Sequence, residues 1–471
     1  MALSSLACSA LHCIRNTSSY IWTAVLVLGL AFINPFGSRQ AAEDESRNVF
    51  FSIIAPFYPA SAQKLITVVI VDDEALAKAK ETFPPSFAYY DRLLANIAAY
   101  QPKAIFLDFL LADPRGNPAD LDRLAANISQ LAAAKNIPVL MPVLLEAERG
   151  NGAVAKPDVQ QTLPALRQVA QPVHVELLEQ GARIEPIINA AAPATHYNAA
   201  SLGLYRIYAQ SSGIPLDDHA FRDELVVQWG ENVSADNIFL GSEKGCATGA
   251  SPLFRAAKRL WWEFFPAAGR GALQRLHNCS SHTTVRSDLV HRIGLLRAET
   301  ARNGHADPDG FARELFADRY VFIGAEFSGQ NDYGLSPVYG RQTGVHIHAM
   351  AFDNLVVYGS DYFHPWPKVL TVGADSILEA VLVLFSGWLA ATWARRSRHQ
   401  PPTLRAGLCF ALIGLAVPLL VLTYSTMVLR FEPVNWIGLL TIGLMFNARL
   451  FKDLILTAFS DPIRTGAAHA E

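Results

Sequence analysis

The stretch 319-RYVFIGAEFSGQNDYGLSPVYGRQTGVHIHAMAFDNLV-356 decides the fold of this 471-residue chain. It opens on an apolar run, residues 320–323, of the kind that forms strands buried on both faces. A polar loop follows, in which Gly340 and Gly344 mark turns. Residues 345–356 then have the apolar spacing of an amphipathic helix. Strand, loop and helix in this order form the half-unit of a layered α/β domain.

Apolar runs and helical patterns also alternate upstream of this stretch. Further strands are expected at residues 66–71, 104–107, 139–145, 198–206 and 225–229. Helices are expected at residues 87–100 and 119–135 between the first three strands. Such alternation implies parallel pairing with right-handed crossovers and helices on both faces. We therefore predict an α/β domain with a layered, mostly parallel sheet and flanking helices.

Long apolar runs flank this domain. Half of the residues (51%) are hydrophobic and only 17% are charged, which fits membrane helices joined to one water-soluble domain. Four transmembrane helices are expected, at residues 20–36, 369–393, 406–428 and 434–450. The first could instead be a cleaved signal peptide. We favour an uncleaved anchor, because the small residues at its end come late and follow Pro35.

Basic residues set the expected orientation of the spans. Arg395, Arg396, Arg398 and Arg405 crowd the link between the second and third spans, which the positive-inside rule places in the cytoplasm. The termini, residues 1–19 and 451–471, are then cytoplasmic, and residues 39–367 form a domain outside the membrane. Within that domain, residues 235–310 are expected to be an insertion. Its aromatic-basic piece, residues 259–265, predicts a local satellite core, or a partner or membrane-surface contact.

Several motifs resemble the CHASE sensor domain of the second type. They are VFIG (321–324), the loop holding Asp332, GVHIHA (344–349), VVIVDDEAL (68–76) and the run 89–114, YYDRLLANIAAYQPKAIFLDFLLADP. The order of one span, a large domain and three closing spans is also similar. The resemblance implies an extracytoplasmic sensory module of a multi-pass protein in a bacterial inner membrane, with a periplasmic domain. That family usually carries an output domain after the last span, and in this sequence residues 451–471 follow the last expected span.

Aspartates come directly after three of the expected strands. They are Asp72 and Asp73, Asp108, and Asp332. Because parallel strands end at one edge of the sheet, these carboxylates can converge with His348 on a pocket for a cation or a ligand with amines or hydroxyls. The resemblance lends weight to Asp73, Asp108, Asp332 and His348. The alternative is that the aspartates cap helices and the histidine is hydrogen-bonded in the core.

Two further pairs of residues stand out. Cys246 and Cys279 lie in the soluble region and would form a disulfide if that region is periplasmic; otherwise they are unrelated thiols. Asp375 and Glu379 lie one turn apart on the second span. Acidic groups in lipid are costly, so they are candidates for a contact between helices that transmits a signal. Alternatively, Glu379 sits in the outer turn and reaches water.

Other classes of function lack support in the sequence. The net charge of −3 gives no sign of nucleic-acid binding. Walker, dinucleotide and HExxH patterns are absent, so we predict no catalytic residue, no cofactor and no metal site. His346 and His348 point to different faces of their helix, which argues against a shared zinc ion.

Two functions remain. One is a sensory or receptor subunit that signals through its helices to a separate protein. The other is a non-enzymatic assembly subunit of a membrane-envelope complex. The ligand, the partner and the oligomeric state, including a homo-oligomer, stay open.

Overall fold

The computed structural model describes residues 29, 38–146, 158–160, 162–190, 195–234, 236–237, 250–269, 271, 279–303, 310–327, 332–369, 372–399, 403–448, 450–452 and 455–456. The chain divides into two compact units. The larger is Phe51–His364, and the smaller combines Met1–Phe50 with Pro365–Glu471.

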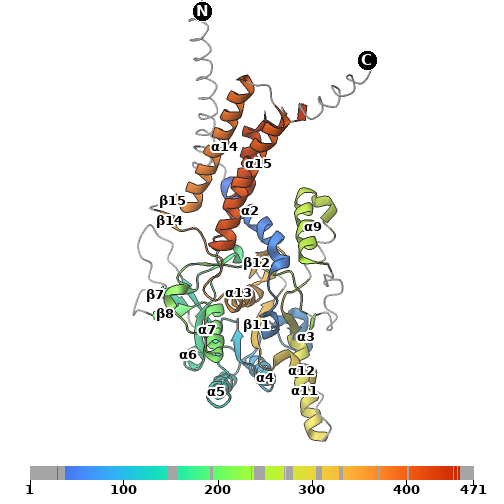
Figure 1. Ribbon diagram of the computed structural model, residues 1–471. Coiled ribbons are helices and arrows are strands. Elements are labelled where there is room, and N and C mark those ends of the chain that lie inside the picture. The colour runs from blue at the N-terminus through green and yellow to red at the C-terminus, as the bar shows by residue number, and fades with distance from the viewer. Residues whose placement is uncertain are drawn as a thin grey trace, which may run out of the picture. The chain divides into compact units, whose positions relative to one another are not determined.

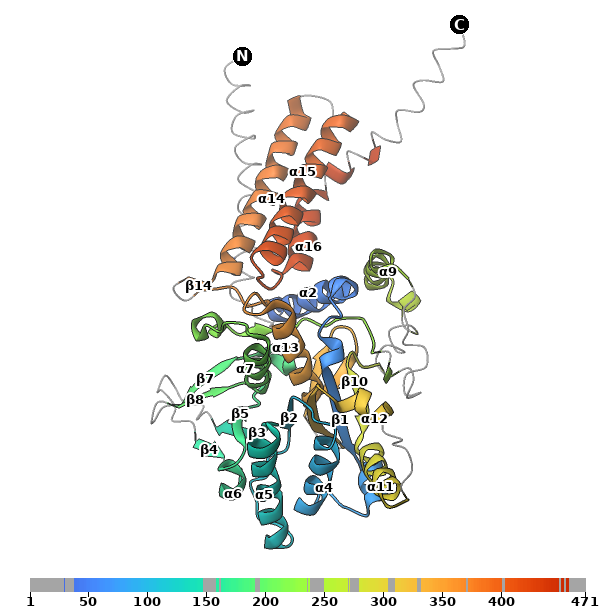
Figure 2. The ribbon, with the colours of Figure 1, turned by 60° about the horizontal axis from the view of Figure 1, so that its bottom comes forward.

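The larger unit is built on a sheet in which six parallel strands pair within the described residues (Figure 2). Their order is β10-β1-β11-β2-β3-β5, and a seventh strand, β4, pairs antiparallel with the end of β3. The bounds are β1 Ile66–Asp72, β2 Ala104–Leu107, β3 Val139–Glu146, β4 Asp158–Gln160, β5 Gln171–His174, β10 Thr283–Arg286 and β11 Tyr320–Glu326. The strand of the quoted stretch, β11, thus lies between β1 and β2 and confirms a predominantly parallel α/β fold.

Alternation along β1 explains how both faces of the sheet are buried. Val68 and Ile70 join one apolar cluster, whereas Val69 and Val71 join the other. The first cluster is covered by α7 (Ala200–Ser212) and α13 (Gly344–Tyr358). The second is covered by α4 (Phe87–Ala98), α5 (Pro118–Lys135), α11 (Ser287–Asn303) and α12 (Gly310–Phe316). Strands that alternate between two apolar layers read as continuous apolar runs, as the sequence does here.

The strand predicted at residues 198–206 is wrong. Those residues form the start of α7, and only the short β8 (Thr195–Asn198), paired with β7 (Ile187–Ala190), precedes it. A short apolar run fits a buried helix as well as a buried strand. Close packing favours the helix, because a Cβ on Gly203 would lie 3.0 Å from Leu140 of β3.

Two other segments differ from expectation. The predicted strand at residues 225–229 shrinks to β9 (Leu225–Val226), which pairs with β6 (Arg183–Ile184) outside the main sheet. Part of the predicted insertion 235–310 belongs to the core, because β10 pairs in parallel with β1 and leads into α11. That region also contains helix α9 (Pro252–Phe264), labelled in Figure 1.

The smaller unit contains the apolar helices. They are α14 (Ala374–His399), α15 (Leu404–Thr423), its continuation η5 (Tyr424–Val428) and α16 (Trp436–Phe446). Among the described residues, Ala374–Ser397 and Leu404–Val428 are long and apolar enough to cross a membrane. The expected fourth span contains only the shorter helix α16, and the expected first span, residues 20–36, lies outside the described residues apart from Gly29. Two of the four expected spans are therefore supported.

Candidate functional site

At the C-terminal end of β11, the segments that follow neighbouring strands run to opposite faces of the sheet. β1 and β2 continue into α3 (Asp73–Ala79) and α5, which lie with the second apolar cluster. Between them, β11 continues through the hairpin β12 (Tyr333–Ser336) and β13 (Gly340–Thr343) into α13, on the other face. In open α/β sheets, the crevice outside the carboxyl ends of the strands at such a divergence is where ligands bind.

Asp108 and Asp332 approach each other at this crevice. The Asp108 backbone N–H donates to the Ile323 carbonyl of β11 (2.8 Å), which fixes Asp108 beside the exit of β11. The Asp108 side chain is half-buried, so it keeps some contact with solvent. Burial and the nearby charge of Asp332 raise its pKa well above the usual range. Burial also raises the pKa of Asp332, although that side chain keeps a solvent-exposed side.

Neither carboxyl has a cationic partner among the residues that the structure describes. For the partly buried Asp108 this is unusual, because buried carboxylates in folded proteins are normally paired with a cation or accept several hydrogen bonds. An unpaired acidic pair at a strand exit can stay protonated or can bind a positively charged group.

Asp72 and Asp73 occupy more ordinary positions at the same edge. The Asp72 carboxylate caps α3 by accepting from the Ala75 N–H (2.7 Å) and forms an ion pair with Arg286 of β10 (3.1 Å). Asp73 is exposed in the first turn of α3, where helix N–H groups favour a carboxylate. Asp72 therefore fits the capping alternative, whereas Asp108 does not.

The register adds a residue that the sequence reasoning missed. Glu326 is paired with Asp72 across β1 and β11, so two carboxylates stand side by side. Burial and then the charge of Asp72 raise the pKa of Glu326. The sequence signal was present, because Glu326 ends the predicted strand just as Asp72 and Asp108 follow theirs.

The hairpin carries the other polar groups of the crevice. The carbonyl of Asp332 accepts from the N–H of Gly344, the first residue of α13 (3.1 Å), and a Cβ on Gly344 would lie 2.5 Å from the Asp332 carboxylate. The hairpin thus holds this carboxylate against the start of α13. Beside it, the guanidinium of Arg341 lies 3.8 Å from the ring centre of Tyr333, a cation–π contact.

His348 does not join the carboxylates, which corrects the predicted convergence. It is 1% exposed in the core beneath the opposite face, with its ring 5.7 Å from that of Phe106. Burial, then the nearby His174, lowers its pKa to about 3. Because α13 is buried on all sides from Gly344 to Leu355, it carries His348 into the core rather than to the strand exits.

A buried polar network on α13 was not predicted. His282 Nε2 lies 3.0 Å from Asp353 Oδ2, and the Tyr58 hydroxyl donates to Asp353 Oδ1 at 2.6 Å. Asn354 donates to the Tyr58 hydroxyl (2.9 Å). His346 lies in the same region, with Nδ1 3.5 Å from Ser280 Oγ. These groups satisfy one another, so the network fixes the position of α13 and offers no open site.

The remaining predicted residues lie elsewhere. Cys279 is disulfide-bonded to a partner outside the described residues, and Cys246 is itself outside them. In the smaller unit, Asp375 and Glu379 of α14 both lie near Arg39, at 3.8 and 3.3 Å. Arg39 belongs to α2 (Ser38–Ile54) and also pairs with Glu43 at 2.6 Å.

Those three carboxylates are close enough together to bind a metal ion. The Arg39 guanidinium already contacts all three. Glu379 also accepts from the Asn435 backbone N–H (3.0 Å). The arrangement therefore acts as a contact between helices.

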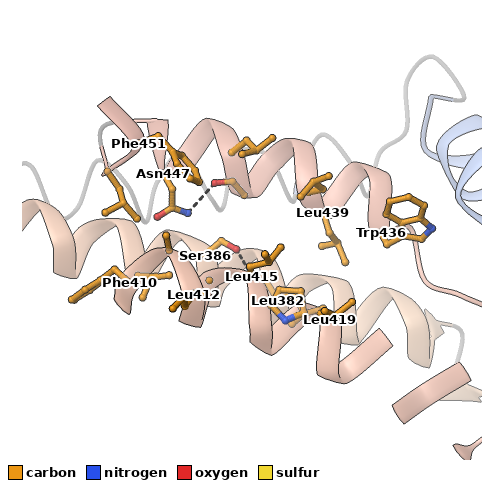
Figure 3. A pocket seen from close by; sticks show the side chains of 18 of the residues that line it. Leu382, Ser386, Phe410, Leu412, Leu415, Leu419, Trp436, Leu439, Asn447 and Phe451 are labelled. Atoms are coloured by element: carbon orange, nitrogen blue, oxygen red, sulfur yellow. Dashed lines mark hydrogen bonds between the residues drawn. The ribbon is translucent and has the colours of Figure 1, made fainter. Parts of the chain in front are cut away.

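A cavity in the smaller unit is apolar. It measures about 420 Å³ and lies among α14, α15 and α16, lined chiefly by leucines together with Phe410 and Trp436 (Figure 3). Its few polar groups include Asn447, which donates to the Gly443 carbonyl (2.9 Å). A charged or strongly polar ligand does not fit such a lining.

The comparisons with known proteins give one family. A model of the CHASE2 domain matches residues 22–390, well over half of the chain. No curated protein and no solved structure matches significantly.

Proposed function

The chain belongs to the CHASE2 domain family, a family of extracellular sensory domains, and from that premise we propose that it is a membrane-anchored receptor for a cationic ligand. The ligand binds at the crevice between the exits of β1, β11 and β2, where Asp108 and Asp332 receive its positive charge. The domain faces the periplasm of a bacterial inner membrane, and the chain signals to a separate protein.

The unpaired state of Asp108 carries this proposal. A carboxyl whose pKa is raised by burial and by a neighbouring carboxylate is held away from its preferred, ionised form. A bound cation removes both causes at once, because it replaces lost hydration and screens Asp332. Cation binding therefore recovers the free energy that burial and charge repulsion cost the ionised Asp108.

A ligand acts as a signal only if it prefers one of two conformations. The hairpin offers such an element, because Asp332 contacts the first residue of α13 and a cation shared with Asp108 would draw the hairpin toward β2. In the smaller unit, Arg39 connects α2 with α14 through Glu379. Ser46 of α2 lies 3.2 Å from Asn435 in the link before α16. These polar contacts are the proposed route by which α2 and the closing helices change their packing together.

The test is a thermal-shift panel on the full chain in lipid nanodiscs, with polyamines, amino-acid amides and divalent cations. We expect one class of cation to raise the unfolding temperature of the wild type and to have no effect on Asp108→Asn or Asp332→Asn. Asp113→Asn, an exposed aspartate after β2, is the matched control and should respond as the wild type does. A cation that stabilises all four proteins equally, or a panel without any hit, contradicts the proposal.

A further inference from the structure

Helix α9 is amphipathic with its polar face turned inward. It begins at Pro252 after Ser251, whose hydroxyl accepts from the Phe254 N–H (3.4 Å). A surface helix of a soluble domain normally packs its apolar stripe on the core and shows its charges to water. In α9 the charged face packs on the domain and the apolar face is exposed.

The inward face is held by buried charges. Arg259 is 1% exposed and pairs with Glu231, which is 4% exposed, at 3.2 Å. Arg255 pairs with the same carboxylate at 3.4 Å. Arg259 also donates to the Ser52 hydroxyl of α2 (3.0 Å). Two arginines on one carboxylate fix the rotation of α9, so its other face must point away from the domain.

That outward face is apolar and aromatic. Trp261 is 56% exposed and Phe265, just after the helix, is 50% exposed; their ring centres lie 4.1 Å apart. The other exposed members are Leu253 (72%), Phe254 (61%) and Leu260 (40%). Contiguous apolar surface of this kind marks a contact with a membrane or a protein.

We propose that the outward face of α9 lies in the interface of the bilayer in which the chain is anchored. Trp, Phe and Leu on one side with a lysine nearby are the composition of helices that lie in the plane of a membrane. Here Lys258 extends over the Trp262 ring, 4.9 Å from its centre, as basic and aromatic side chains do at a bilayer surface.

The chain itself brings a bilayer to this helix. The larger unit ends at His364, and the candidate span begins at Ala374, ten residues later. A surface tethered by so short a connection is present at a high effective concentration. A soluble partner would instead have to be captured from solution. This inference is independent of the ligand crevice, because no residue of α9 belongs to it.

Fluorescence in nanodiscs tests the proposal on the full chain. The emission of Trp261 is obtained by subtracting the spectrum of Trp261→Phe from that of the wild type. We expect it to lose the larger part of its intensity when the acyl chains are brominated. Trp388, exposed on α14, is the positive control, and Trp229, 2% exposed in the larger unit, is the negative control, each obtained with its own Phe variant.

One double variant tests whether the face itself is responsible. Leu253→Asp combined with Phe254→Asp adds two charges to the outward face, and the quenching of Trp261 should then disappear while that of Trp388 remains. A Trp261 emission that is red-shifted and unquenched would mean that the face is in water and would overturn the proposal. A blue-shifted, unquenched emission would overturn it too, because a second copy or another protein would then cover the helix.

Discussion

Replacing Asp108 by asparagine should stabilise the ligand-free protein at neutral pH. The folded state raises the pKa of this carboxyl above its unfolded value. The folded protein therefore binds the proton more tightly than the unfolded chain, and stability falls as pH rises through the window between the two pKa values. Asparagine keeps the shape and does not ionise, so the variant escapes that loss.

The size of the effect follows from the same linkage. Each pH unit that separates the folded from the unfolded pKa corresponds to about 1.4 kcal/mol. In a domain of about 150–250 residues 1 kcal/mol corresponds to about 2–4 °C in Tm, and the longer unit Phe51–His364 belongs at the lower end of that range. Because Asp108 keeps some contact with solvent, screening reduces the gain. We expect the increase in Tm at pH 8 to be about 2–3 °C for each pH unit between the two pKa values, which is the lower end of the range that this conversion gives.

Differential scanning fluorimetry of the full chain across pH measures this gain. The difference between Asp108→Asn and the wild type should be greatest at pH 8 and should vanish near pH 4, about the ordinary pKa of an aspartate. The exposed Asp113→Asn should show no such pH dependence. A variant less stable than the wild type at pH 8, or equally more stable at both pH values, would refute the reasoning.

Two predictions concern packing and buried charge. Gly324→Ala should cost about 1–3 kcal/mol by overpacking, because its Cβ would press on the Val345 side chain, whereas Gly310→Ala, which meets nothing, should be neutral in the same denaturation experiment. Glu231→Gln should cost about 3–5 kcal/mol by leaving Arg259 buried without its partner. Its control is Glu224→Gln, which loses only a partly exposed pair with Arg183; equal costs for these two variants would contradict the importance of the buried pair.

The buried strands were predictable because each carries its own signal. β1, β2, β3 and β11 are apolar on both faces, and no tertiary information is needed to recognise them. β10 was missed for the opposite reason. Its sequence, TTVR, is short and has three polar residues out of four, and it becomes a strand only because β1 offers an unpaired edge.

The candidate site was predictable only in part. The grouping of the aspartates could be predicted, whereas the position of His348 could not, for a physical reason. Strand exits share an edge in any parallel sheet, so the grouping of Asp108 with Asp332 follows from topology alone. The place of His348 depends on which side of α13 packs on the sheet. Helical periodicity separates His346 from His348 but does not tell which of them faces which neighbour. The packing of α13 on the sheet decides this, and it brings the His348 ring to 5.7 Å from the ring of Phe106 in β2.

The orientation of helix α9 could not be predicted from the sequence either. Periodicity reveals two faces, and the general rule assigns the apolar one to the core. A single carboxylate elsewhere in the chain reverses that assignment. Once Glu231 is buried at 4% exposure, Arg255 and Arg259 must turn toward it, since leaving a buried charge unpaired costs more than exposing apolar side chains. The orientation of an amphipathic helix is therefore set by where its charges find partners, and the apolar face turns to whatever lies outside.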